Sequence, residues 1–97
     1  MTNLKILVDN VKAELFDKEF EIEELDNKIK EIFKTRDTIW DNVKEWVINN
    51  SENDTTICSC YHIKNENVLY VTFKICKNKY DKLLKYAVVK IVDIEAK

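Results

Sequence analysis

The sequence predicts an α+β fold in which helices come first and strands follow. Apolar residues recur at helical spacing over residues 4–46, and they alternate with polar residues over 57–75. A length of 97 residues is that of one ordinary domain, and no linker divides these two parts. We therefore expect a single domain over residues 1–97, made of a helical region at 1–50, a β-hairpin at 55–77 and a C-terminal helix at 78–97.

The helical region follows one heptad register. Both seam positions are largely apolar, one at Val8, Leu15, Ile22, Ile29 and Val43, and the other at Leu4, Val11, Leu25, Ile32, Ile39 and Trp46. Lys18 and Arg36 place charges in the seam, so we expect the helix to break near both residues. Thr38 and Asp41 have the spacing of a capping box, which predicts the start of a helix after the second break.

The apolar stripe widens along this register. Before Ile29 it is mostly the narrow seam of a helix that packs on another helix, whereas Phe33, Trp40 and Val47 add the third position typical of a helix on a globular core. The earlier helical part is therefore expected either to fold back as an antiparallel helical hairpin or to form a coiled coil with a second copy. The second alternative predicts a homodimer through the helical region.

Residues 55–77 have the alternation of two strands. The apolar residues all fall on odd positions, at Ile57, Tyr61 and Ile63 and then at Leu69, Val71, Phe73 and Ile75. A three-residue loop at 65–67 places residue 64 opposite residue 68, and it keeps the odd positions together on the core face of the hairpin.

The C-terminal segment has two interpretations. Helical spacing relates Leu84, Val88 and Ile91, and Asn78 resembles a helix start, so we expect a helix over 78–97. A third strand is the alternative, because β-branched residues are frequent here, at Val88, Val89, Ile91, Val92 and Ile94.

The composition argues against several kinds of enzyme. The chain has no glycine and no proline, and phosphate-binding loops and glycine-flanked nucleophiles need backbone conformations that glycine adopts at low cost. We expect no catalytic residue and no cofactor. No segment approaches the ~20 apolar residues of a membrane span, and no signal peptide is evident. Three cysteines, an odd number, predict reduced thiols and a cytoplasmic protein that does not associate with membranes.

Four residues are weak candidates for a metal site or a Cys–His nucleophile, namely Cys58, Cys60, His62 and Cys76. Their even numbers place them on the hairpin face away from the core. Thiolates and imidazole bind zinc, but Cys58 and Cys60 lack the Cys-x2-4-Cys spacing of a structural zinc site and no second close pair exists. The expected register also keeps Cys76 and His62 near opposite ends of the hairpin. We expect no metal here, and we interpret these residues as half-buried side chains under a helix or a partner.

Charged residues are unevenly distributed. An acidic ridge in the helical region provides candidate partner-binding residues, at Glu19, Glu21, Ile22, Glu23, Glu24, Leu25, Asp26 and Ile29. Such a ridge is typical of a solvated helix face, and its negative charge also attracts the basic surface of a partner protein. A basic stripe at Lys74, Lys77, Lys79, Lys82, Lys85 and Lys90 is suited to a phosphate backbone. The net charge of −2 weighs against nucleic acid.

Taken together, these features favour a non-enzymatic protein–protein interaction module. One form of it is a small regulator or inhibitor, of the kind that phages and mobile elements encode, which acts by binding a larger protein. The alternative is a nucleic-acid-binding protein that uses the basic stripe.

Overall fold

A computed structural model describes residues 4–63, 66–77 and 87–97 of the chain. Over these residues the order of elements is α1 (Leu4–Leu15), β1 (Glu19–Glu21), α2 (Ile22–Phe33), α3 (Thr38–Asn49), β2 (Thr56–Ile63), β3 (Asn67–Lys77) and β4 (Val88–Ala96). The four strands form one antiparallel sheet in the order β1-β4-β3-β2. The fold is therefore α+β, as the sequence predicts.

The helical region is broken at the two predicted places. Lys18 lies between α1 and β1, and Arg36 lies between α2 and α3. Because no glycine is available, Asp17 and Lys34 adopt positive φ angles of 63° and 51° at these two breaks. The predicted capping box is wrong in detail, since the N-cap of α3 is Asp37, whose side chain accepts from the Trp40 backbone N–H.

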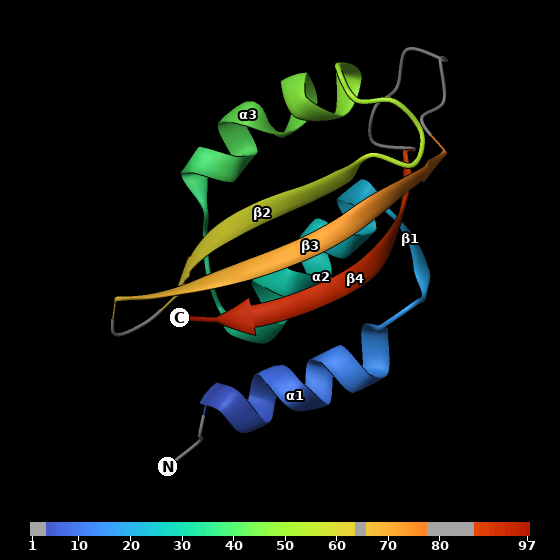
Figure 1. The fold of residues 1–97 in the computed structure, drawn as a ribbon. Coiled ribbons are helices and arrows are strands. Elements are labelled where there is room, and N and C mark those ends of the chain that lie inside the picture. The colour runs from blue at the N-terminus through green and yellow to red at the C-terminus, as the bar shows by residue number, and fades with distance from the viewer. Residues whose placement is uncertain (1–3, 64–65, 78–86) are drawn as a thin grey trace.

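The helices do not form a coiled coil or a separate helical hairpin. Ile22, Leu25 and Ile29 of α2 are only 2%, 2% and 0% exposed, and they belong to one core that also contains residues of the sheet. Figure 1 shows α2 behind the sheet, with α1 running along β4 and α3 along β2. The sheet therefore covers the narrow seam. A heptad pattern predicts that this face of the helix is buried, but it does not tell whether a sheet or another helix covers it.

The predicted strands of the hairpin are present, but they belong to a larger sheet and have another register. Ile63 lies opposite Asn67 and Tyr61 opposite Leu69, which shifts the pairing by two residues from the expected one. Because the side-chain period of a strand is two, the odd positions still face the core.

The predicted C-terminal helix is wrong, because residues 88–96 form the strand β4. This strand lies between β3 and β1, and it buries the β-branched residues Val89, Ile91 and Ile94 in the core. Pairing on both sides overrides the helical spacing of the segment. Residues 78–86, where the predicted helix begins, lie outside the described residues. Among the helices that the structure describes, none is long and apolar enough to cross a bilayer.

Candidate functional site

An apolar stripe on α3 points away from the core. Ile39, Val43 and Trp46 are 61%, 41% and 69% exposed, and they lie on one side of the helix at i, i+4 and i+7. The core side of the same helix buries Trp40 and Ile48, and the Trp40 ring packs edge-on against Phe73 of β3. The exposed stripe is therefore not needed to hold α3 on the sheet.

The segment before α3 fixes this helix to the end of β2. Asp37 Oδ1 accepts from the Trp40 backbone N–H at 2.8 Å, and Asp37 Oδ2 accepts from the His62 backbone N–H at 3.1 Å. The Thr35 hydroxyl donates to the His62 carbonyl oxygen. Both backbone groups of His62 are therefore bonded on the side of β2 that faces away from β3.

These bonds define which backbone groups of β2 are free. In an antiparallel pair, residues alternate between bonding the neighbouring strand and pointing away from it. His62 points away, and Thr55 bonds Ile75 of β3 through its carbonyl oxygen, so the N–H and C=O groups of Thr56, Cys58 and Cys60 also point away. Since β2 is an edge strand, no described strand pairs with them.

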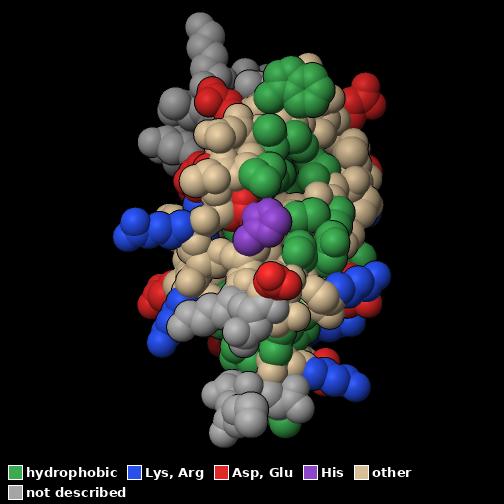
Figure 2. Space-filling view, turned by 90° about the vertical axis from the view of Figure 1, so that its left-hand side faces the viewer, with side chains coloured by type: hydrophobic (Ala, Val, Ile, Leu, Met, Phe, Trp, Pro, Cys, Tyr) green, Lys and Arg blue, Asp and Glu red, His purple; other side chains and the backbone are tan. Residues whose placement is uncertain are grey.

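A groove separates the stripe from this strand edge. It has a volume of about 350 Å³ and is lined by Ile39, Trp40, Val43 and Val47 of α3 and by residues 57–60 of β2. Figure 2 shows a band of hydrophobic side chains down this side of the molecule, next to the single histidine, His62. We call the stripe, the groove and the free edge of β2 the α3–β2 surface.

The edge of β2 lacks the usual protection against pairing. Natural edge strands are commonly blocked by charged side chains, proline or bulges, whereas no lysine, arginine, aspartate, glutamate or proline occurs from Thr55 to Ile63. The pairing of β2 with β3 is also free of bulges. Within the described residues, the edge over residues 56–60 therefore has none of these three blocks, whereas Asp37 and Thr35 cover it at His62.

The candidate metal residues do not converge. Cys58, Cys60 and His62 are exposed on the sheet face opposite the core, where they lie across from Thr72, Tyr70 and Val68. Cys76 lies on β3, beyond the paired residues of β2. Within the described residues, no three histidine, cysteine or acidic side chains are close enough to hold a metal ion. Burial raises the pKa of the Cys60 and Cys76 thiols, which lowers their thiolate fractions.

The acidic ridge is divided between core and surface. Ile22, Leu25, Asp26 and Ile29 are buried, so that no partner reaches them in this fold, which corrects their prediction as partner-binding residues. Glu19, Glu21 and Glu24 are exposed, and their role in binding remains a prediction. Glu23 is half-buried and pairs with Lys44 at 3.3 Å.

Asp26 is the centre of a buried polar cluster between α2, α3 and β2. Its side chain is 1% exposed and accepts from the Tyr61 hydroxyl at 2.6 Å and from the Lys30 and Lys44 ammonium groups, both at 2.9 Å. Burial alone would raise the pKa of Asp26, but these hydrogen bonds outweigh burial and hold it below the ordinary value. Both oxygens of the Asp26 carboxylate are therefore hydrogen-bonded within the protein, which indicates a structural role for this residue.

Only part of the basic stripe can be located. Lys74 and Lys90 lie directly opposite each other on β3 and β4. Their ammonium groups approach acidic side chains, Lys74 with Asp54 at 3.4 Å and Lys90 with Asp17 at 3.5 Å. Lys77 is the last residue of β3. Lys79, Lys82 and Lys85 lie outside the described residues.

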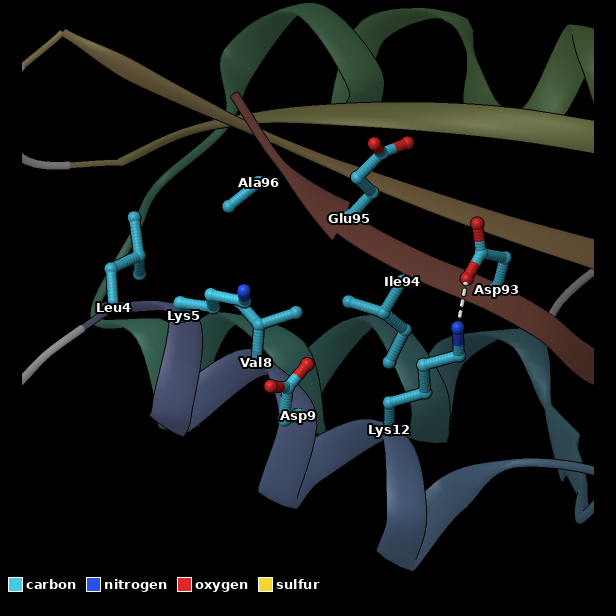
Figure 3. A pocket seen from close by; sticks show the side chains of 9 residues that line it. All are labelled: Leu4, Lys5, Val8, Asp9, Lys12, Asp93, Ile94, Glu95 and Ala96. Carbon is cyan, nitrogen blue, oxygen red and sulfur yellow. Dashed lines mark ion pairs between the residues drawn. The ribbon is translucent and has the colours of Figure 1, made fainter.

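A second hollow lies between α1 and β4 (Figure 3). Its volume is about 510 Å³, and its walls mix apolar side chains such as Val8 and Ile94 with charged ones. Lys12 and Asp93 pair across it at 2.6 Å. Basic and acidic side chains both line these walls, so no single ligand chemistry is favoured.

Comparison with known proteins identifies no relative. No protein-family model matches the chain, and neither the curated proteins nor the solved structures give a significant match. Functional inference therefore depends on the geometry of the α3–β2 surface. Sequence reasoning missed this surface, although the uncharged run from Thr55 to Ile63 was visible in the sequence.

Proposed function

We propose that this protein is a non-enzymatic protein-binding module and that it binds through the α3–β2 surface. The observation that carries the proposal is the exposed stripe of Ile39, Val43 and Trp46 beside an uncharged, unpaired strand edge. Apolar side chains supply affinity when a partner covers them. A strand edge supplies backbone hydrogen bonds that fix the register of the partner. A small regulator or inhibitor would use such a surface to hold a larger protein.

Replacing Val43 by glutamate is expected to abolish protein binding while the fold is retained. The new charge lies in the middle of the stripe, where covering it removes it from water without a counter-charge. Val43 is 41% exposed, so the unbound domain tolerates the change. The measurement is affinity capture with the full chain from cells of the native host, followed by mass determination of the intact complexes.

Ala13→Glu is the matched control for this capture experiment. It adds the same charge at an exposed helical position on α1, which lies along β4 and away from β2 (Figure 1). The expected result is a protein retained by the wild type and by Ala13→Glu but lost with Val43→Glu. Equal capture by all three chains would show that binding, if any, uses another surface.

A second candidate function is binding of nucleic acid by the basic stripe. The observation in its favour is that Lys74 and Lys90 lie directly opposite each other, which places two positive charges side by side on one face of the sheet, each with one acidic neighbour, Asp54 or Asp17. If this candidate holds, charge reversal of Lys74 and Lys90 to glutamate weakens the binding of single- or double-stranded oligonucleotides. The affinity also falls steeply between low and moderate salt. Binding that is absent, or insensitive to salt, excludes it.

A further inference from the structure

The chemistry of the α3–β2 surface defines what covers it. Neither the stripe nor the free edge carries a charged side chain, so charge complementarity requires a partner surface that is also neutral and apolar. The partner must in addition offer unpaired backbone donors and acceptors to the edge of β2. This chain itself presents such a surface.

The free groups of β2 are also arranged symmetrically. Between Thr55, which bonds β3, and His62, which bonds the segment before α3, the outward N–H and C=O groups of Thr56, Cys58 and Cys60 have no hydrogen-bond partner among the described residues. A two-fold axis at Cys58 places Thr56 opposite Cys60 of a second copy, and Cys58 opposite Cys58. All free backbone groups of both strands then find partners across the axis.

The same axis brings the two stripes together. Antiparallel pairing in one sheet has its two-fold axis perpendicular to the sheet, so both copies of α3 lie on the same face of the joined sheet. Figure 2 shows hydrophobic side chains gathered on the side of the molecule that faces the viewer, next to His62. One arrangement therefore pairs the two β2 edges and also brings the two α3 stripes together, as a self-complementary interface requires.

We propose that the occupant of the α3–β2 surface is a second copy of this chain, joined through antiparallel pairing of the two β2 strands centred on Cys58. The inference rests on the proposed function, because it names the partner of the same surface. The dimer has one continuous sheet through both copies. It uses α3 and β2, not the narrow seam of α1 and α2, which is buried in the core.

The mass of the purified chain in solution is the first test. Sedimentation equilibrium from micromolar to millimolar concentration is expected to give a mass that rises with concentration to twice the chain mass of 11.6 kDa. Val43→Glu is expected to raise the dissociation constant at least about tenfold, because two buried charges then face each other across the axis. Ala13→Glu is expected to leave it unchanged.

The cysteines report the position of the axis. With Cys60 and Cys76 replaced by serine, a short bis-maleimide should link the two remaining Cys58 thiols in high yield, because they lie directly opposite each other on the uncovered face of the joined sheet. With Cys58 and Cys76 replaced instead, Cys60 faces Thr56 of the second copy, and the yield should be much lower. Equal yields from the two variants would overturn the axis at Cys58.

A chain that remains monomeric over the whole concentration range would overturn the pairing of two copies. The proposed function is tested separately by the capture experiment. A monomeric wild type that still captures a protein, with loss of capture in Val43→Glu, retains the binding surface but assigns it to a different protein. A monomer whose capture does not depend on Val43 removes both proposals.

Discussion

Replacing Ile29 by aspartate is expected to unfold the domain. The Ile29 side chain is fully buried (0% exposed) in the core that α2 shares with the sheet. A carboxylate at this position would be buried without a counter-charge, and substitutions of this kind lower the free energy of unfolding by more than about 4 kcal/mol. A domain of this length has a total free energy of unfolding of about 5–15 kcal/mol, so little stability remains. Urea unfolding followed by circular dichroism measures the effect.

The same substitution at Ile39 is the matched comparison. Ile29 and Ile39 both occupy seam positions of the heptad register, but Ile39 is 61% exposed in the first turn of α3. Aspartate is favourable near a helix N-terminus, so the free energy of unfolding should change by less than about 0.5 kcal/mol in dilute solution. If Ile29→Asp were folded and merely monomeric, the seam would be an interface and the core assignment would be wrong.

Replacing Asp26 by asparagine is expected to lower the free energy of unfolding by about 2 kcal/mol. Removing one partner of a buried ion pair costs roughly 3–5 kcal/mol, and the smaller figure allows for the partial exposure of the lysines. The side chains of Lys30 and Lys44 are 22% and 15% exposed. Asp41→Asn is the control, because Asp41 contacts the same lysines but is 38% exposed. It should cost less than about 1 kcal/mol.

The contribution of Asp26 should also depend on pH. The pKa of its carboxyl is lower in the folded chain than in the unfolded chain, because Tyr61, Lys44 and Lys30 donate to it and outweigh the effect of burial. The unfolded state therefore binds the proton more tightly. The stabilisation is complete above the unfolded pKa and is lost as the pH falls through the folded pKa. In urea unfolding, the free energy of unfolding of the wild type should fall as the pH is lowered. In Asp26→Asn this fall should be smaller, because the contribution of the Asp26 carboxyl is absent. Identical pH profiles would contradict the cluster.

Several elements of the fold follow from the sequence. The charges at Lys18 and Arg36 interrupt the seam, and both breaks are found. Alternation identified β2 and β3 and their core face, because that face depends only on the parity of the residue numbers. The register was wrong by two residues, since parity constrains the face of a strand but not its pairing. The strand β4 was predicted only as the alternative to a helix, because its β-branched residues also fit a helical period, and pairing on both sides decides between the two.

The binding surface could not be derived from the heptad pattern. That pattern continues without a change of phase from Ile29 to Val43, yet the first residue is buried and the second is 41% exposed. The segment at 34–37, fixed by Asp37 and Thr35 to His62, reorients the chain between them. The sequence favoured the narrow early seam as the part in need of a partner. In the structure the sheet covers that seam, and the exposed stripe lies on α3.

Amide hydrogen exchange of β2 tests most directly whether a second copy covers the α3–β2 surface. The N–H groups of Ile57 and Ser59, which face β3, should exchange slowly at every concentration. Those of Thr56, Cys58 and Cys60 should exchange rapidly in dilute wild type and slowly in concentrated wild type. In Val43→Glu they should exchange rapidly at both concentrations. Rapid exchange of these three groups in concentrated wild type would contradict the proposed pairing.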